Sequence, residues 1–96
     1  MIRGTTPTVY FALDGIVESD IKELYITIRQ GSTSVTKTDY KSEDGVYYVK
    51  LTQEETLSFM DGAIYCQIKI LTTDGNVVAT PIRVLRMNDI LMEEVI

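Results

Sequence analysis

The side chains that most often perform chemistry in proteins are scarce in this chain. Its 96 residues include no histidine and a single cysteine, Cys66. Without an imidazole group, Ser-His-Asp and Cys-His catalysis and most zinc sites are excluded. Cys66 stands among apolar residues at every second position, so we expect a buried and unreactive thiol, because a reactive thiol needs an exposed electropositive setting.

Carboxylates are the remaining groups that could act as acid–base catalysts or metal ligands. A first acidic group is formed by Asp14, Glu18, Asp20 and Glu23. It lacks the D-x-D-x-D-G pattern of a calcium loop, and we expect a solvated acidic loop. Glu54 and Glu55 are neighbours that point to different sides of a predicted helix, so they do not converge. We therefore predict no catalytic residue, no cofactor and no metal ligand, and expect a non-enzymatic protein. A small enzyme that uses only carboxylates and tyrosines is a remote alternative.

Three tyrosines suggest a binding surface. Tyr10, Tyr25 and Tyr48 occupy positions opposite the apolar face of their predicted strands. Exposed tyrosines can form a protein-binding face or a platform for a sugar, although tyrosine also favours strands by propensity alone. A carbohydrate- or surface-binding β-sandwich module is therefore an alternative function.

The charge of the chain argues against two classes of partner. The net charge is −5, and no basic patch is present. Binding to nucleic acid or to anionic membranes is therefore not expected. The first residues lack the apolar core of a secretory signal, no apolar run approaches the roughly 20 residues of a membrane helix, and one cysteine cannot form an intrachain disulfide. We expect a protein made in the cytoplasm.

Six runs of residues have the alternation of β-strands. They cover residues 8–13, 21–29, 33–40, 46–51, 63–72 and 77–87. In the second run Leu24, Ile26 and Ile28 share one face, as expected for a strand with one face on the core and one in water. The third run is polar on both faces, so it is predicted to be a weak edge strand. Turn residues at Glu43-Asp44-Gly45 predict a hairpin between the third and fourth runs.

The last two runs are joined at Asp74-Gly75, which predicts a hairpin with a type I′ turn and φ > 0 at both central residues. We expect the apolar faces of the two strands to meet, with Ile64, Cys66, Ile68 and Ile70 opposed by Val78, Ile82 and Val84. Pro81 cannot donate a ladder hydrogen bond, so the last strand must be an edge, a bulge or a sheet-switching strand at that point.

One segment interrupts the β pattern. Thr52 and Glu55 have the spacing of a capping box, which begins a helix, and Asp61-Gly62 would end it. We predict a two-turn helix that crosses from one sheet to the other. The whole pattern predicts one domain, residues 1–96, with an antiparallel immunoglobulin-like β-sandwich of about six to seven strands and one short crossover helix.

Both ends of the chain could make contacts with other subunits, and the C-terminal tail provides the strongest indication of function in the residues themselves. Residues 1–7 read as an extended N-terminal arm stiffened by Pro7, or as an ordered first strand. Residues 88–96 form an apolar and acidic C-terminal tail that must fold back, fray or dock on another subunit. The polar edge strand also offers a place for strand addition, although its threonine and lysine content discourages random pairing. The residues predicted to mediate interaction are Tyr10, Tyr25, Tyr48, Ile90, Leu91, Val95 and Ile96.

Four stretches of the chain resemble motifs of small, mostly uncharacterised prophage proteins of Gram-positive bacteria. These are MIRGTTPT at residues 1–8, VKLTQEET at 49–56, QIKILTTDG at 67–75 and MEEVI at 92–96. They are similar to that family's M-x-R-G-T-T-P-T, V-K-L-T-Q-E-D-T, Q-I-R-V-L-T-x-x-G and D-D-E-V-L segments. The layout is also similar to the immunoglobulin-like N-terminal domain of phage baseplate upper proteins.

These resemblances imply a non-enzymatic structural or assembly component of a virion, tail or baseplate. Its partners would be other phage structural proteins or further copies of itself as a homo-oligomer, and its location would be the cytoplasm on synthesis and then the virion. The resemblance supplies no functional residues.

Overall fold

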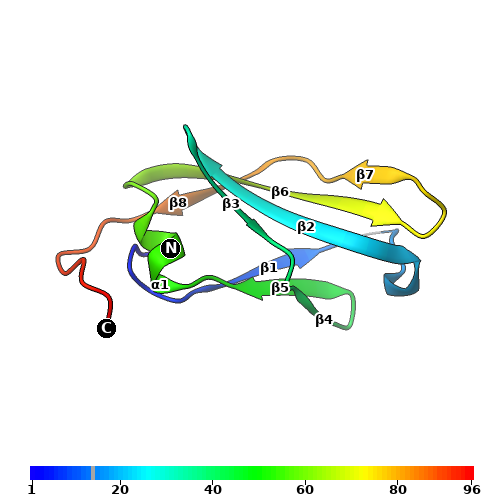
Figure 1. The fold of residues 1–96 in the computed structure, drawn as a ribbon, viewed down its shortest axis with the longest axis horizontal. Coiled ribbons are helices and arrows are strands. Elements are labelled where there is room, and N and C mark those ends of the chain that lie inside the picture. The colour runs from blue at the N-terminus through cyan, green and yellow to red at the C-terminus, as the bar shows by residue number, and fades with distance from the viewer. Residues whose placement is uncertain (14) are drawn as a thin grey trace.

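The computed structural model describes residues 1–13 and 15–96, which form two antiparallel β-sheets packed face to face (Figure 1). The three-stranded sheet has the order β1 (Thr8–Ala12), β5 (Val46–Lys50), β4 (Lys41–Glu43). The five-stranded sheet has the order β3 (Thr33–Lys37), β2 (Ile21–Gln30), β6 (Gly62–Thr72), with β7 (Val77–Ala79) and β8 (Arg83–Met87) both pairing with β6. A 3₁₀ turn, η1 (Glu18–Asp20), precedes β2. The predicted antiparallel β-sandwich is confirmed.

The core lies between the two sheets and is built from the inward side chains of alternating residues. Leu24, Ile26 and Ile28 are buried on β2, as their spacing predicted. From β6 come Ile64, Cys66, Ile68 and Ile70, and from the three-stranded sheet Val9, Phe11, Tyr47 and Val49. Each fully buried aliphatic or aromatic side chain contributes about 1.5–3 kcal/mol relative to leaving it in water. This shared apolar layer holds the sheets together.

The last predicted strand is divided at Pro81, and this changes which of its residues face the core. Along β7 the partners are Ile70 and Val78, whereas along β8 Ile64 pairs with Leu85, so the register shifts by one residue between them. A shift of one residue moves every following side chain to the other face of the sheet.

The expectation that Val78, Ile82 and Val84 meet the core strand holds in register only for Val78, which lies opposite Ile70. It was wrong for Ile82, which lies between β7 and β8, and for Val84, which lies opposite the outward Tyr65. All three are exposed, and Met87 is fully buried instead. Of the alternatives open for Pro81, the structure has both an edge strand and a bulge.

The predicted type I′ turn at Asp74-Gly75 was also wrong. Gly75 has φ 88°, but Asp74 has no positive φ, and Thr72 N donates to Asn76 O at 2.8 Å around a three-residue loop. The type I′ geometry occurs instead at the β4–β5 hairpin, where Asp44 and Gly45 have φ 51° and 78°. A three-residue loop with a final left-handed glycine is the next commonest hairpin solution.

The chain also contains a strand that the sequence did not predict. After Lys37 the chain leaves the five-stranded sheet, and Lys41–Glu43 form β4 on the edge of the other sheet. The polar run 33–40 is thus shorter than expected, although its edge position in β3 is confirmed. With β4 and the divided last strand, the described residues form eight strands instead of the expected six or seven.

The predicted capping box is present at the start of α1 (Gln53–Leu57). Thr52 Oγ1 accepts from Glu55 N at 3.1 Å, and Thr52 N donates to Glu55 Oε1 at 2.8 Å. The helix is shorter than the two turns expected, because the chain turns after Leu57 to bury Phe59 in the core. It links β5 to β6 and so crosses between the sheets as predicted. No helix within residues 1–13 and 15–96 is long and apolar enough to span a membrane.

Replacing the capping threonine tests how much α1 contributes. Thr52→Ala removes the acceptor for Glu55 N and should lower stability by about 1 kcal/mol, which lowers the melting temperature by roughly 4–8 °C in a domain of this size. Thr52→Ser keeps the hydroxyl and should melt close to the wild type. Circular dichroism melting curves of the three proteins provide the measurement. Equal melting of Thr52→Ala and wild type would contradict this account of the helix start.

Candidate functional site

The two ends of the chain lie side by side at one end of the sandwich. Ile2 and Asn88 form an isolated parallel bridge. Asn88 N donates to Met1 O at 2.7 Å, and Arg3 N donates to Asn88 O at 2.9 Å. Further along, Leu51 N donates to Pro7 O, and Thr56 Oγ1 donates to Thr5 O, both at 2.9 Å. The expected N-terminal arm is therefore ordered against the protein's own body.

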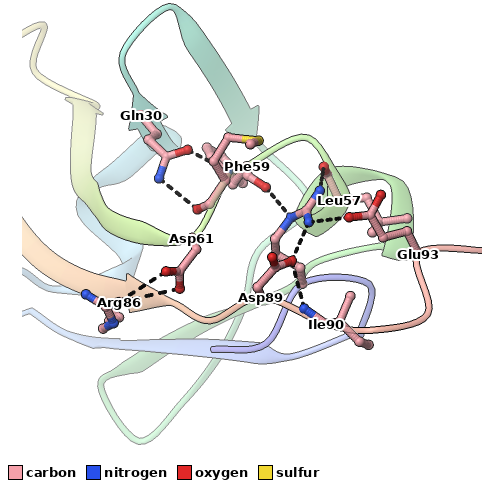
Figure 2. Close-up of polar contacts among 10 residues, drawn as sticks. Gln30, Leu57, Phe59, Asp61, Arg86, Asp89, Ile90 and Glu93 are labelled. Carbon is pink, nitrogen blue, oxygen red and sulfur yellow. Dashed lines mark hydrogen bonds and ion pairs between the residues drawn. The ribbon is translucent and has the colours of Figure 1, made fainter.

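The side chain of Arg3 joins three segments that are distant in sequence. It is only 7% exposed, and Figure 2 shows its partners around the end of α1. Arg3 Nε donates to Phe59 O at 2.5 Å and Nη2 to Leu57 O at 3.1 Å. Nη1 donates to Asp89 Oδ1 at 2.6 Å and to Glu93 Oε1 at 2.9 Å. The planar guanidinium group thus bridges the N-terminal segment, the helix end and the C-terminal tail, as only an arginine fork can.

The charges in this cluster stabilise one another. Hydrogen bonds to Asp89 and then Glu93 raise the pKa of Arg3 above its usual value, despite the opposing effect of burial. The hydrogen bond from Arg3 is the main reason that the pKa of Asp89 is lowered, and Ile90 N adds a second donor. The backbone carbonyls at the end of α1 carry partial negative charge, which also favours a cation there.

A second pair of contacts fixes the far end of the tail. Gln53 Nε2 donates to Ile96 O, and Ile96 N donates to Gln53 Oε1, each at 2.8 Å. Of the three outcomes left open for residues 88–96, the structure shows the tail folded back along the body. Its backbone is held at both ends, by Arg3 and by Gln53.

The apolar side chains of the tail do not share this burial. Ile90 is partly buried, and a Cβ atom added to Gly4 would lie 3.7 Å from its Cδ1. Leu91 and Ile96 are almost fully exposed, and Met92 and Val95 are about half exposed. Among the tail residues predicted to mediate contacts, three therefore face solvent and Ile90 packs inward.

The predicted tyrosines lie on two different sheets. Tyr10 and Tyr48 are cross-strand partners on the three-stranded sheet, with ring centroids 5.7 Å apart. Tyr25 lies on β2 of the other sheet, where its hydroxyl donates to Glu23 Oε2 at 2.5 Å. This hydrogen bond is the main reason that the pKa of Tyr25 is raised. The three residues do not form one continuous binding face.

Sequence reasoning missed a fourth outward tyrosine, on the same sheet as Tyr25. Tyr65 on β6 alternates with Ile64 and Cys66, so the same period of two could have identified it. Tyr65 and Tyr25 border two adjoining hollows on the outer face of the five-stranded sheet, of about 240 and 410 Å³, which share Thr27 and Lys69. The hollows are open depressions lined by both polar and apolar side chains.

The only thiol is placed as the sequence predicted. Cys66 is 1% exposed within the core, and burial raises its pKa to about 11, with a smaller opposing effect of Arg83. Of the predicted acidic loop, Asp14 lies outside the described residues, while Glu18 accepts a hydrogen bond from Ser42 Oγ at 2.5 Å. Among the residues that the structure describes, no three potential ligands of the His, Cys, Asp or Glu type gather around one point.

Removal of the Arg3 guanidinium group should loosen both chain ends. Arg3→Met keeps an unbranched stem but leaves the carbonyls of Leu57 and Phe59 without their donor, at a cost of roughly 2–3 kcal/mol of unfolding free energy. Arg3→Lys keeps the charge without the fork and should give an intermediate loss. Urea unfolding measures the stability, and ¹⁵N relaxation should show faster motion of residues 90–96. Wild-type stability and wild-type tail order in Arg3→Met would show that the cluster is dispensable.

The same cluster should make stability depend on pH. Because the pKa of Asp89 is lowered on folding, its ionised form adds stability above the unfolded value of about 4 and ceases to do so as the pH falls through the lower folded value. The difference in unfolding free energy between wild type and Asp89→Asn should be largest near neutral pH and shrink below about pH 4. Urea unfolding across this range measures it. A difference that stays constant with pH would contradict the proposed role of the Arg3–Asp89 pair.

Comparisons with known proteins identified no relative of this chain. No family model, no curated protein and no solved structure matches the chain. The case for a function therefore rests on the contacts described above and on the sequence motifs.

Proposed function

We propose that this protein is a non-enzymatic structural or assembly module of a phage or prophage, a component of the virion, tail or baseplate. It acts through contacts with other phage structural proteins or with further copies of itself. The phage origin is supported by the four motifs, at residues 1–8, 49–56, 67–75 and 92–96.

The observation that carries the assembly role is the exposed apolar tail. Leu91, Met92, Val95 and Ile96 face solvent within six residues, while hydrogen bonds to Arg3 and Gln53 hold the segment in place. Single exposed apolar residues are ordinary, but a contiguous group of them is typical of a surface that another protein covers. An ordered segment also loses less conformational entropy on binding than a free tail would.

The charge of the tail adds to this surface. Glu93 is held by Arg3, and Glu94 stands exposed beside Val95. A partner that fits this segment would present an apolar pocket with a basic rim, because opposite charges at the rim favour association and orientation.

The carbohydrate-binding alternative receives less support from the same geometry. The three tyrosines that would form a sugar platform are divided between two surfaces, because Tyr10 and Tyr48 lie on one sheet and Tyr25 lies on the other. The assembly role depends on no such arrangement.

A pair of matched variants tests the tail as the contact surface. Leu91→Ser with Ile96→Ser removes two exposed apolar side chains of the tail and should weaken binding to the structural proteins encoded by neighbouring genes by about tenfold or more. The control is Val77→Ser with Ile82→Ser, which removes a side chain that is 59% exposed on β7 and one that is 61% exposed between β7 and β8, and it should leave binding unchanged.

Titration calorimetry measures the affinities, and light scattering after size exclusion measures self-association. Equal weakening by both pairs would show that the tail has no special role. If the wild type and a tail-deleted chain are both monomeric and neither binds any of those structural proteins, the proposed function is wrong.

A further inference from the structure

Three of the four outer sheet edges are protected against pairing with another chain. At β1, Arg83 Nη1 donates to Tyr10 O at 2.7 Å. β4 has only three residues. The β7–β8 edge is interrupted at Pro81, and the N-terminal amino group of Met1 donates to Arg86 O at 3.0 Å. Short strands, bulges, prolines and covering groups are the usual means by which proteins prevent edge-to-edge association.

The fourth edge, β3, lacks these features. It contains five residues and no proline, and among residues 1–13 and 15–96 its only ladder partner is β2. Its one charged side chain, which could guard the edge, is drawn away from it: Lys37 Nζ lies 2.9 Å from Glu55 Oε1 and 3.8 Å from Asp39 Oδ1, and the side chain is 11% exposed. The backbone hydrogen bonds within residues 1–13 and 15–96 include none, outside the ladder with β2, in which residues 31–39 take part.

The turn at the start of β3 determines which of its backbone groups are free. Gly31 has φ 57° and Ser32 has no positive φ, which is the pattern of a two-residue type II′ hairpin. In such a hairpin the closing pair, Gln30 and Thr33, exchanges both backbone hydrogen bonds. Because hydrogen-bonded and non-hydrogen-bonded pairs alternate along the strand, the backbone N–H and C=O groups of Val35 point toward β2. The N–H and C=O groups of Ser34 and Thr36 then point outward, away from β2.

The base of this hairpin is fixed to the body. Gln30, on the far side of Phe59 in Figure 2, makes three hydrogen bonds to this part of the body. Gln30 Nε2 donates to Met60 O at 2.9 Å and to Ala63 O at 3.2 Å, and Met60 N donates to Gln30 Oε1 at 2.7 Å. The free edge is therefore presented in one defined orientation, which reduces the entropy lost on pairing.

We propose that β3 pairs antiparallel with β3 of a second copy of this chain, about a twofold axis that passes beside Val35. The inference rests on the proposed assembly function and names one of its partners. Ser34 of each copy exchanges backbone hydrogen bonds with Thr36 of the other, and the two five-stranded sheets become one continuous sheet.

The side chains of β3 suit a second copy because the strand is nearly symmetric about Val35. Small hydroxyl residues, Ser34 and Thr36, flank it on the outer face, where serine–threonine pairs across strands are favourable. Val35, which is partly buried against the core, meets Val35 of the second copy and completes its burial. Lys37 lies opposite Thr33, so this register brings no like charges together.

Charge pairs at the two outward positions test both the pairing and its register. In the proposed dimer, Ser34→Lys with Thr36→Glu places opposite charges across the interface twice. Ser34→Lys with Thr36→Lys places like charges there twice. The dissociation constants of these two variants should differ by about tenfold or more, as measured by sedimentation equilibrium. Both positions are exposed in the monomer, so the two variants should have similar melting temperatures at protein concentrations low enough that neither dimerises.

Cross-linking provides a second measurement that does not depend on charge. Residues at position 35 form a non-hydrogen-bonded pair across the axis, with Cα atoms about 4.5 Å apart, within the range of a disulfide. Val35→Cys should form a covalent dimer on mild oxidation. Thr36→Cys is the control, because diagonal neighbours are about 7–8 Å apart and out of reach. The buried Cys66 does not compete.

The outcomes separate this inference from the proposed function. A concentration-dependent dimer with the expected charge and disulfide pattern supports the β3 pairing, even if no phage structural protein binds the tail. A wild type that stays monomeric, equal dissociation constants for the two charge variants, or no cross-linking of Val35→Cys overturns the pairing. Binding of structural proteins through the tail would leave the proposed function standing in that case.

Discussion

The buried guanidinium group of Arg3 is the contact on which the arrangement of both chain ends depends. Its donors lie in one plane and reach the carbonyls of Leu57 and Phe59 and the carboxylates of Asp89 and Glu93. A buried charge is costly unless each of its polar neighbours is satisfied, and a cation surrounded by four acceptors meets that condition. The helix end, the first residues and the last residues are thereby held as one unit.

This arrangement explains how the tail can be ordered and still present apolar side chains to solvent. The last residues of most domains are poorly ordered unless contacts with the body tie them down. Here the side chain of Arg3 binds the carboxylate of Glu93, and Gln53 binds the backbone of Ile96, so burial is not required to keep the segment in place. The side chains at positions 91, 95 and 96 remain available for another surface.

The sequence predicted the two-sheet architecture better than it predicted strand register and turn type. The physical reasons differ from element to element. The period of two in β2 placed Leu24, Ile26 and Ile28 in the core correctly, because alternation is a local property of a strand. The capping box at Thr52 was also predicted correctly, because its two residues lie three positions apart in the chain and the motif is therefore local. The register of β8 could not be predicted, because a proline indicates that the hydrogen-bond ladder is interrupted but does not indicate how many residues the interruption contains.

The contacts of Arg3 could not be predicted from local sequence patterns. Its partners lie 54 to 90 residues away along the chain, and no spacing rule links residues so distant. The exposed edge of β3 could be predicted in part. The polar composition of residues 33–40 indicated an edge strand. The ion pair between Lys37 and Glu55 could not be predicted, because it joins two segments that are brought together only by the fold.

The deep burial of Cys66 has a practical consequence. A single thiol in the shared apolar layer, with its pKa raised to about 11, reacts with an alkylating reagent only when the sheets separate enough to admit it. The rate of labelling therefore reports transient opening of the native molecule without any introduced probe. Any condition that joins copies into larger assemblies and damps these fluctuations would register as slower modification of that one sulfur.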